Sequence, residues 1–150
     1  MGLDYGSRTV GVALSDELLL TATARETIRR PAENKLRRTL ARLEEIIVAE
    51  DVQDIVLGLP VNMDESMSLR AQLAQEFRDK LERRTGIPVR MHDERLTTVE
   101  AEDILAANGV ARKDMKARVD AVAAQVILQD YLDTYHPTPP APVKKRRTKG

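Results

Sequence analysis

The sequence contains no cysteine and only two histidines, His92 and His136. The absence of cysteine excludes thiol catalysis, disulfide bonds and cysteine-ligated zinc, and two histidines argue against a histidine-rich metal site. No apolar run approaches the roughly 20 residues of a membrane-spanning helix. The N-terminus also lacks the basic segment and long apolar stretch of a secretory signal. We therefore expect a cytoplasmic protein.

An excess of charge of one sign is also missing, because 24 basic and 24 acidic residues give a formal net charge of zero. The distribution is uneven, however. Five of the basic residues lie at the end of the chain, with no acid after Asp133: Lys144, Lys145, Arg146, Arg147 and Lys149. Residues 1–143 are therefore net acidic, and any contact with nucleic acid needs a local basic patch or this tail.

The length of 150 residues favours one domain. Hydrophobic periodicity predicts strands at residues 3–15 (two strands and a turn), 18–28, 55–59 and from 88 onward, and helices at about 32–49, 69–85, 97–108 and 117–135. The order βββαβαβαα predicts an α/β fold, a mixed five-stranded sheet with helices on both faces. We expect this domain to span residues 1–136 and the proline-rich, basic residues 137–150 to form a disordered tail.

Acidic residues next to apolar runs mark the candidate active site. They are Asp4 at the end of the first strand, Glu94 after the last strand, and Asp120 in the first turn of the last helix. A buried carboxylate is costly unless something pairs with it, and three converging carboxylates suit hard divalent cations such as Mg²⁺. Each acid also has a simpler interpretation: Asp4 as a turn residue, Glu94 as a solvated charge, and Asp120 as a complement to the helix dipole.

Polar and basic residues near these acids are candidate substrate contacts. The loop that follows residues 55–59 lies at the carboxyl end of a buried strand, where α/β proteins bind ligands. The side chains that we expect to contact phosphate are Arg8, Asn62, Arg70, Arg95 and Lys116. We interpret His92 as a strand residue rather than a ligand.

Four motifs together resemble those of the bacterial YqgF/RuvX family. They are residues 2–16 (GLDYGSRTVGVALSD), a central motif at 56–60 (VLGLP), 62–64 (NMD) and 70–72 (RAQ), then 93–101 (DERLTTVEA) and 119–124 (VDAVAA). The resemblance covers about residues 2–133. It implies an RNase H-like fold and a nuclease that matures the 5′ end of 16S ribosomal RNA, with Holliday-junction resolution as an older proposal. Carried over to this chain, it implies a catalytic, metal-binding triad of Asp4, Glu94 and Asp120.

The sequence thus predicts a hydrolase of phosphodiester bonds, an endonuclease dependent on Mg²⁺ or Mn²⁺ that processes precursor 16S rRNA in ribosome biogenesis. Two alternatives remain: a Holliday junction resolvase in DNA recombination and repair, and a non-catalytic nucleic-acid-binding module in transcription. An ATPase of the actin and sugar-kinase type opens with a similar strand and hairpin. It needs a second domain, for which 150 residues leave no room.

The scarcity of aromatic residues bears on the oligomeric state. A four-way junction is two-fold symmetric, so a resolvase calls for a symmetric dimer, and a standard interface buries about 800 Å² per partner around an apolar centre. The aromatic residues are limited to Phe77, Tyr5, Tyr131 and Tyr135, and no clear apolar patch is apparent. We therefore expect a monomer.

The basic tail generates the first prediction. Deletion of residues 137–150 should leave the fold intact and weaken RNA binding without moving the cleaved position, because phosphate contacts give affinity rather than sequence choice. Binding constants measured over a range of salt concentrations should show a shallower dependence for the truncated chain. An unchanged dependence would mean that the tail contacts no phosphates.

Overall fold

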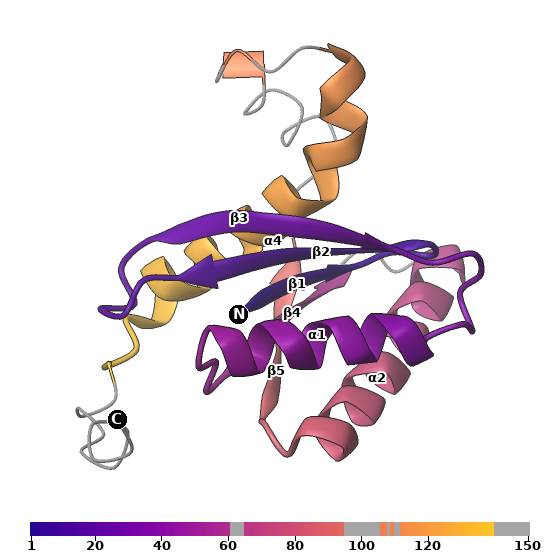
Figure 1. The fold of residues 1–150 in the computed structure, drawn as a ribbon, viewed down its shortest axis with the longest axis horizontal. Coiled ribbons are helices and arrows are strands. Elements are labelled where there is room, and N and C mark those ends of the chain that lie inside the picture. Colours follow the sequence, from indigo (N-terminus) through magenta and orange to yellow (C-terminus); the bar gives the residue numbers. More distant parts are fainter. Residues whose placement is uncertain (61–64, 95–105, 108, 110–111, 140–150) are drawn as a thin grey trace.

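The computed structural model describes the backbone of residues 1–60, 65–94, 106–107, 109 and 112–139, and the side chains of residues 1–58, 69–92, 106–107, 109 and 118–139 (Figure 1). The strands form one five-stranded sheet in the order β3-β2-β1-β4-β5. Their bounds are β1 (Gly2–Tyr5), β2 (Thr9–Ser15), β3 (Ala22–Arg29), β4 (Ile55–Pro60) and β5 (Val89–Glu94). The first three strands are an antiparallel meander, and β4 and β5 join it in parallel. This is the mixed sheet that the sequence predicts.

Helices cover both faces of the sheet, as expected (Figure 1). The α1 helix (Arg37–Ala49) and α2 helix (Glu65–Thr85) lie on one face, and α4 (Arg112–Tyr135) lies on the other. Two apolar cores result. The larger core joins Leu3, Val10, Val12 and Leu57 to α1 and α2, and the smaller one joins Ala13 and Val56 to Ala124, Ile127 and Leu128 of α4. No helix in the described ranges is long and apolar enough to cross a membrane.

The third strand begins at Ala22 and not at Leu18, as the sequence suggested. The carboxylate of Asp16 accepts hydrogen bonds from the backbone amides of Leu20, at 2.8 Å, and Thr21, at 3.1 Å. Leu19 adopts a φ of 58° inside this turn. The threonine-rich sequence favoured a longer strand, and the only sequence signal of the turn is the single Asp16.

The first helix also begins later than predicted, at Arg37 instead of Ala32. The residues just before it take part in a polar cluster with Arg30 and Arg70. The Glu33 carboxylate pairs with Arg70 of α2, and the Glu33 carbonyl accepts a hydrogen bond from Arg30 Nε. These tertiary contacts override the local helical pattern.

The other helices are longer than expected at their N-terminal ends, because α2 begins at Glu65 and α4 at Arg112. Asp120 therefore lies about two turns inside α4 and not in its first turn. Its position cannot be explained by the helix dipole, whose effect is confined to the terminal turn. Of the helix predicted at 97–108, only residues 106 and 107 are described, and they are helical.

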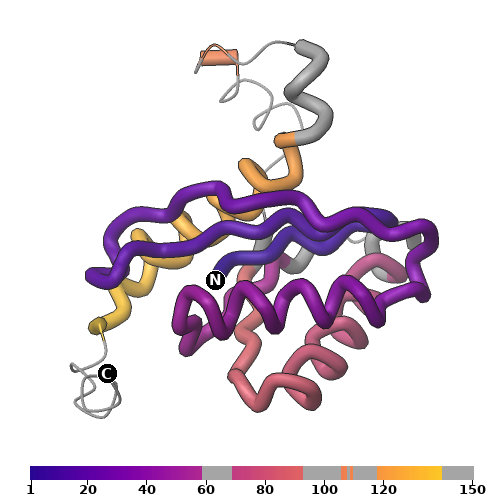
Figure 2. The backbone as a smooth tube through the Cα atoms, in the orientation of Figure 1, coloured from indigo at the N-terminus to yellow at the C-terminus, as the bar shows by residue number. Residues whose placement is uncertain are grey.

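Figure 2 shows α4 passing along the sheet, and the helix contacts the strands at two glycines. A Cβ atom on Gly2 would lie 2.6 Å from the Cβ of Leu128, and a Cβ on Gly11 would lie 1.8 Å from the Asp120 carbonyl oxygen. No side chain fits at Gly11, since its neighbour there is the helix backbone itself. The helix is thus held against the sheet by backbone-to-backbone contact.

This contact generates the second prediction. Gly11→Ala should displace α4 and destabilise the protein by about 1–3 kcal/mol or more, the cost of overpacking a core. Gly6→Ala is the control, because its Cβ would lie 3.1 Å from the Thr9 hydroxyl and 3.2 Å from the Thr9 carbonyl oxygen, contacts far less severe than that at Gly11. Circular dichroism melts should show a much larger loss for Gly11→Ala. Equal melting temperatures would contradict the contact.

Candidate active site

Asp4 lies at the carboxyl end of β1 on the sheet face that α4 covers. Its neighbours fix this orientation, because Gly2 contacts α4 and Leu3 is fully buried in the opposite core. Successive side chains of a strand alternate between faces, so Asp4 shares the face of Gly2. Its cross-strand partner in β2 is Gly11.

Asp120 also lies next to Gly11, on the helix side. The backbone of Asp120 lies directly on Gly11, and Gly11 is the residue opposite Asp4 in the sheet. Residues directly opposite in an antiparallel pair have Cα atoms about 4.5–5.5 Å apart. Two carboxylate residues more than a hundred positions apart in the sequence are therefore neighbours, and both are partly exposed.

The position of Glu94 is described only for its backbone. Glu94 is the last residue of β5 and pairs with Pro60 of β4, which in turn lies next to β1. Its Cα is two strands from β1, about 10 Å at the usual strand spacing, at the same edge of the sheet. The side chain lies outside the described residues, so the convergence of all three acids remains a prediction.

The chemistry of the donors fits a divalent cation. Asp4 and Asp120 offer carboxylate oxygens, the ligands preferred by Mg²⁺ and Mn²⁺. No group of three metal-binding side chains occurs among the side chains that the structure describes, which exclude that of Glu94. His92, the histidine nearest to Glu94 in the sequence, is already paired with another residue, because its Nε2 lies 2.6 Å from Asp130 Oδ2.

The His92 pair ties the strand of Glu94 to the helix of Asp120. His92 is buried on β5, and its ring makes edge contacts with Tyr131 and Tyr135 of α4, at centroid distances of 5.7 and 6.0 Å. The interpretation of His92 as a strand residue is thus consistent with the structure. Sequence reasoning missed its partner Asp130, because nothing local marks a contact across 38 residues.

On the opposite face, Tyr5 anchors the end of β1 in a polar and aromatic cluster. Its ring stacks on Phe77 at 4.6 Å, and the guanidinium carbons of Arg30 and Arg70 lie 4.9 and 5.5 Å from its centroid. Burial, followed by a hydrogen bond to Glu33, raises the pKa of Tyr5 to about 12. The phenol therefore stays neutral at ordinary pH and donates to the Glu33 carboxylate.

Arg30 connects this cluster to the turn after Asp4. It is buried, and its Nη2 donates to the Gly6 carbonyl at 2.5 Å. Because Tyr5 and Gly6 directly follow Asp4, these contacts hold the backbone of the candidate site from behind. Sequence reasoning missed Arg30, since arginine is seldom buried without a specific partner.

The predicted substrate contacts fall into different surroundings. Arg8 is exposed in the turn between β1 and β2. Arg70 is instead bound by both carboxylate oxygens of Glu33, each at 2.8 Å, on the Tyr5 side of the sheet. The structure thus separates Arg70 from the Asp4 face. The side chains of Asn62, Arg95 and Lys116 lie outside the described residues.

The strand order, the parallel β1–β4–β5 half and the helices on both faces define an RNase H-like fold. A solved structure titled "T. thermophilus RuvC in complex with Holliday junction substrate" matches with a TM-score of 0.56 over 93% of this chain and 97% of that chain. Their sequences are 16% identical, so the likeness is one of fold.

The chain belongs to the RuvX family, whose model, described as "Holliday junction resolvase", matches residues 1–134. A relative from Lachnospira eligens is 52% identical over 134 residues, covering 89% of this chain and 96% of the relative. A relative from Agathobacter rectalis is 53% identical over 133 residues, covering 89% and 93%. Both are named "Putative pre-16S rRNA nuclease". The family and fold expected from the sequence are thus confirmed.

The placement of Asp4 and Asp120 next to Gly11 generates the third prediction. Without metal, Asp4→Asn and Asp120→Asn should be at least as stable as the unsubstituted protein, because close like charges repel. Added Mg²⁺ should raise the melting temperature of the unsubstituted protein more than that of either variant, since a ligand of the folded state stabilises it. Glu17→Gln, which changes an exposed acid of the β2–β3 turn, is the control. Equal metal-induced shifts in all four proteins would exclude a shared cation.

Proposed function

We propose that this chain is a divalent-metal-dependent endonuclease that processes the 5′ end of precursor 16S rRNA. The observation that carries the proposal is the contact of α4 with Gly11, which makes Asp120 a neighbour of Asp4 at the carboxyl end of β1. Relatives that match along 93–96% of their length share a name that specifies this substrate, which supports RNA over DNA.

The proposed roles follow from the placement of each residue. Asp4 and Asp120, joined by Glu94, would hold the cation at the edge of the sheet. A bound divalent ion can lower the pKa of an attacking water and stabilise the leaving oxygen of a phosphodiester. The protein would keep these ligands in place through the Gly11 contact, between Asp4 and Asp120, and through the Arg30 and Tyr5 contacts at the strand end.

Substrate positioning would come from side chains around this edge. Arg8 is exposed and available to a phosphate. Asn62, Arg95 and Lys116 remain candidates from the sequence. Arg70 is less suited to this role, because its guanidinium already forms a two-oxygen ion pair with Glu33.

Resolution of four-way DNA junctions is the second candidate, favoured by the description of the family model. Symmetric cleavage of a junction requires two matched sites, whereas trimming of RNA requires one. We propose that the chain acts as a monomer. Light scattering at micromolar concentration tests this, and a stable dimer with paired active sites would favour the junction.

The fourth prediction tests the proposed triad. Asp4→Asn, Glu94→Gln and Asp120→Asn should each reduce cleavage by more than about 100-fold. Loss of a residue that only supports a metal ligand costs up to about 100-fold, and loss of a ligand itself should cost more. These substitutions keep the shape of the side chain and remove its charge. Glu17→Gln should cleave normally.

The assay uses precursor 16S RNA and a four-way DNA junction side by side, with Mg²⁺, with Mn²⁺ and with a chelator. Mapping of the new 5′ ends identifies the cut, and circular dichroism confirms that each variant is folded. Near-normal activity in a folded Asp4→Asn or Asp120→Asn variant would exclude the triad. Cleavage of the junction alone would favour the resolvase.

A further inference from the structure

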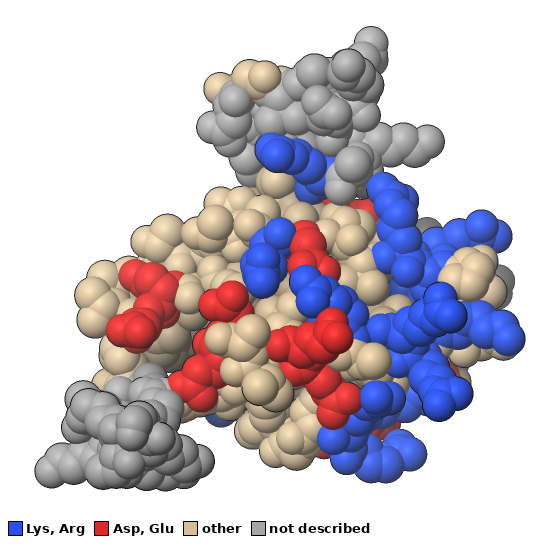
Figure 3. Space-filling view, viewed as in Figure 1, with Lys and Arg blue, Asp and Glu red and all other residues tan. Residues whose placement is uncertain are grey.

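Basic side chains gather at one end of the molecule, to the right in Figure 3. We call five of them the sheet-end basic cluster: Arg8, Arg29, Lys35, Arg37 and Arg38. All five are exposed, and none forms an ion pair with any side chain that the structure describes. Two acids of the neighbouring elements are already paired with other arginines, Glu33 with Arg70 and Glu26 with Arg42.

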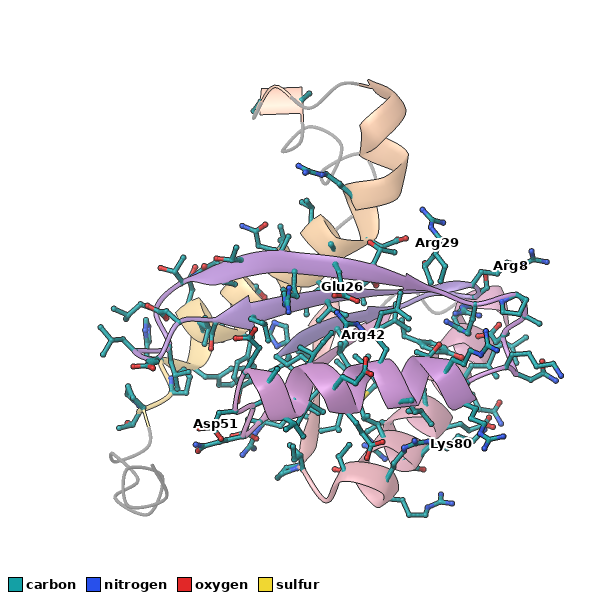
Figure 4. All side chains as sticks on the ribbon, in the orientation of Figure 1. Arg8, Glu26, Arg29, Arg42, Asp51 and Lys80 are labelled. Carbon is teal, nitrogen blue, oxygen red and sulfur yellow. The ribbon has the colours of Figure 1, made fainter. Side chains whose placement is uncertain are left out.

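The cluster begins on the same sheet face as Asp4. Arg29 is paired with Thr9 at the end of β3, next to Ile28, which belongs to the opposite core. Alternation therefore places Arg29 on the face of Asp4 and α4. Arg8 follows in the adjoining turn, where its carbonyl accepts the Arg30 amide at 2.8 Å. Figure 4 shows both side chains projecting from this end of the sheet.

The remaining members of the cluster lie at the start of α1, the helix on the opposite face of the sheet. Lys35 lies just before α1, and Arg37 and Arg38 are its first two residues. Cations at the N-terminus of a helix oppose the helix dipole, and the first turn of α1 contains no acid to compensate. The two arginines therefore do not serve the stability of the helix, which points to an external anion.

The distance from the candidate site suits one continuous ligand. Arg29 is two strands and two residues away from the Asp4 position in the register, which corresponds to about 12 Å between Cα atoms at standard strand spacings. A nucleic acid strand carries a phosphate about every 3.4 Å along a duplex axis, so a few nucleotides span this distance.

We propose that the sheet-end basic cluster binds the phosphate backbone of the substrate strand, guiding it from the Asp4 face over Arg29 and Arg8 to the start of α1. This inference rests on the proposed function and adds a surface that its catalytic carboxylates do not include. The contacts are with phosphates, so they supply affinity and direction rather than sequence choice.

The test compares two double variants of equal charge. Arg37→Gln/Arg38→Gln removes two cluster cations, and Lys80→Gln/Arg83→Gln removes two exposed α2 cations that likewise lack ion pairs among the described side chains. Lys80 lies on the other side of α1 from Arg8 and Arg29 (Figure 4). Binding of a precursor 16S RNA fragment is measured by fluorescence anisotropy over a salt series, in chelator so that no cleavage occurs.

The cluster variant should bind RNA more weakly. The negative slope of log affinity against log salt should become shallower by about 1.5, at roughly 0.7–0.9 per lost phosphate contact. Arg8→Gln/Arg29→Gln should act in the same direction, and the α2 variant should behave like the unsubstituted protein. Equal slopes for the cluster and α2 variants, with both folded by circular dichroism, would overturn the proposal. Binding is measured without metal, so the two proposals can fail separately. If the cluster binds RNA but the protein does not cleave it, the proposed nuclease function is refuted and the proposed binding surface stands.

Discussion

The contact between the backbone of α4 and Gly11 is the constraint on which the candidate site depends. A Cβ atom at this position would lie 1.8 Å from the Asp120 carbonyl oxygen, so any other residue would push the helix away. The contact determines where Asp120 lies, and the β1–β2 register determines that its neighbour is Asp4. One glycine in a strand thus brings together two acids that are distant in the sequence, since glycine permits close backbone approach.

The two faces of the short strand β1 carry different kinds of residue. Asp4 occupies the face covered by α4, and the next residue, Tyr5, enters the cluster of Phe77, Arg30 and Arg70 on the other face. The Arg30 hydrogen bond to Gly6 extends this support to the following turn. Carboxylates that share a cation, as proposed, would need a fixed spacing, and a packed core resists the small shifts that would change it.

The charge distribution is compatible with the proposed action of a chain with no net charge on a polyanion. Paired ions such as Arg42–Glu26 and Arg84–Glu44 cancel over much of the described surface. Among the described side chains, the sheet-end basic cluster has no ion-pair partner. Local fields of this kind guide a charged substrate more effectively than net charge does. A cation held by the carboxylates would remove the repulsion that phosphate otherwise meets there.

The sequence by itself determined the strands, their mixed order and the acids at the strand ends, because alternation, helical periodicity and turn residues are local signals. It also carried the motifs that assign the chain to its family. Only the tertiary structure decided that β3 begins at Ala22, that α1 begins at Arg37, and that Asp120 lies inside α4. The Ala22 amide donates to Gln129 of α4, Glu33 before α1 pairs with Arg70, and the position of Asp120 depends on the full length of α4. The same holds for the engagement of Arg70 by Glu33, since a long-range ion pair leaves no periodic trace in the chain.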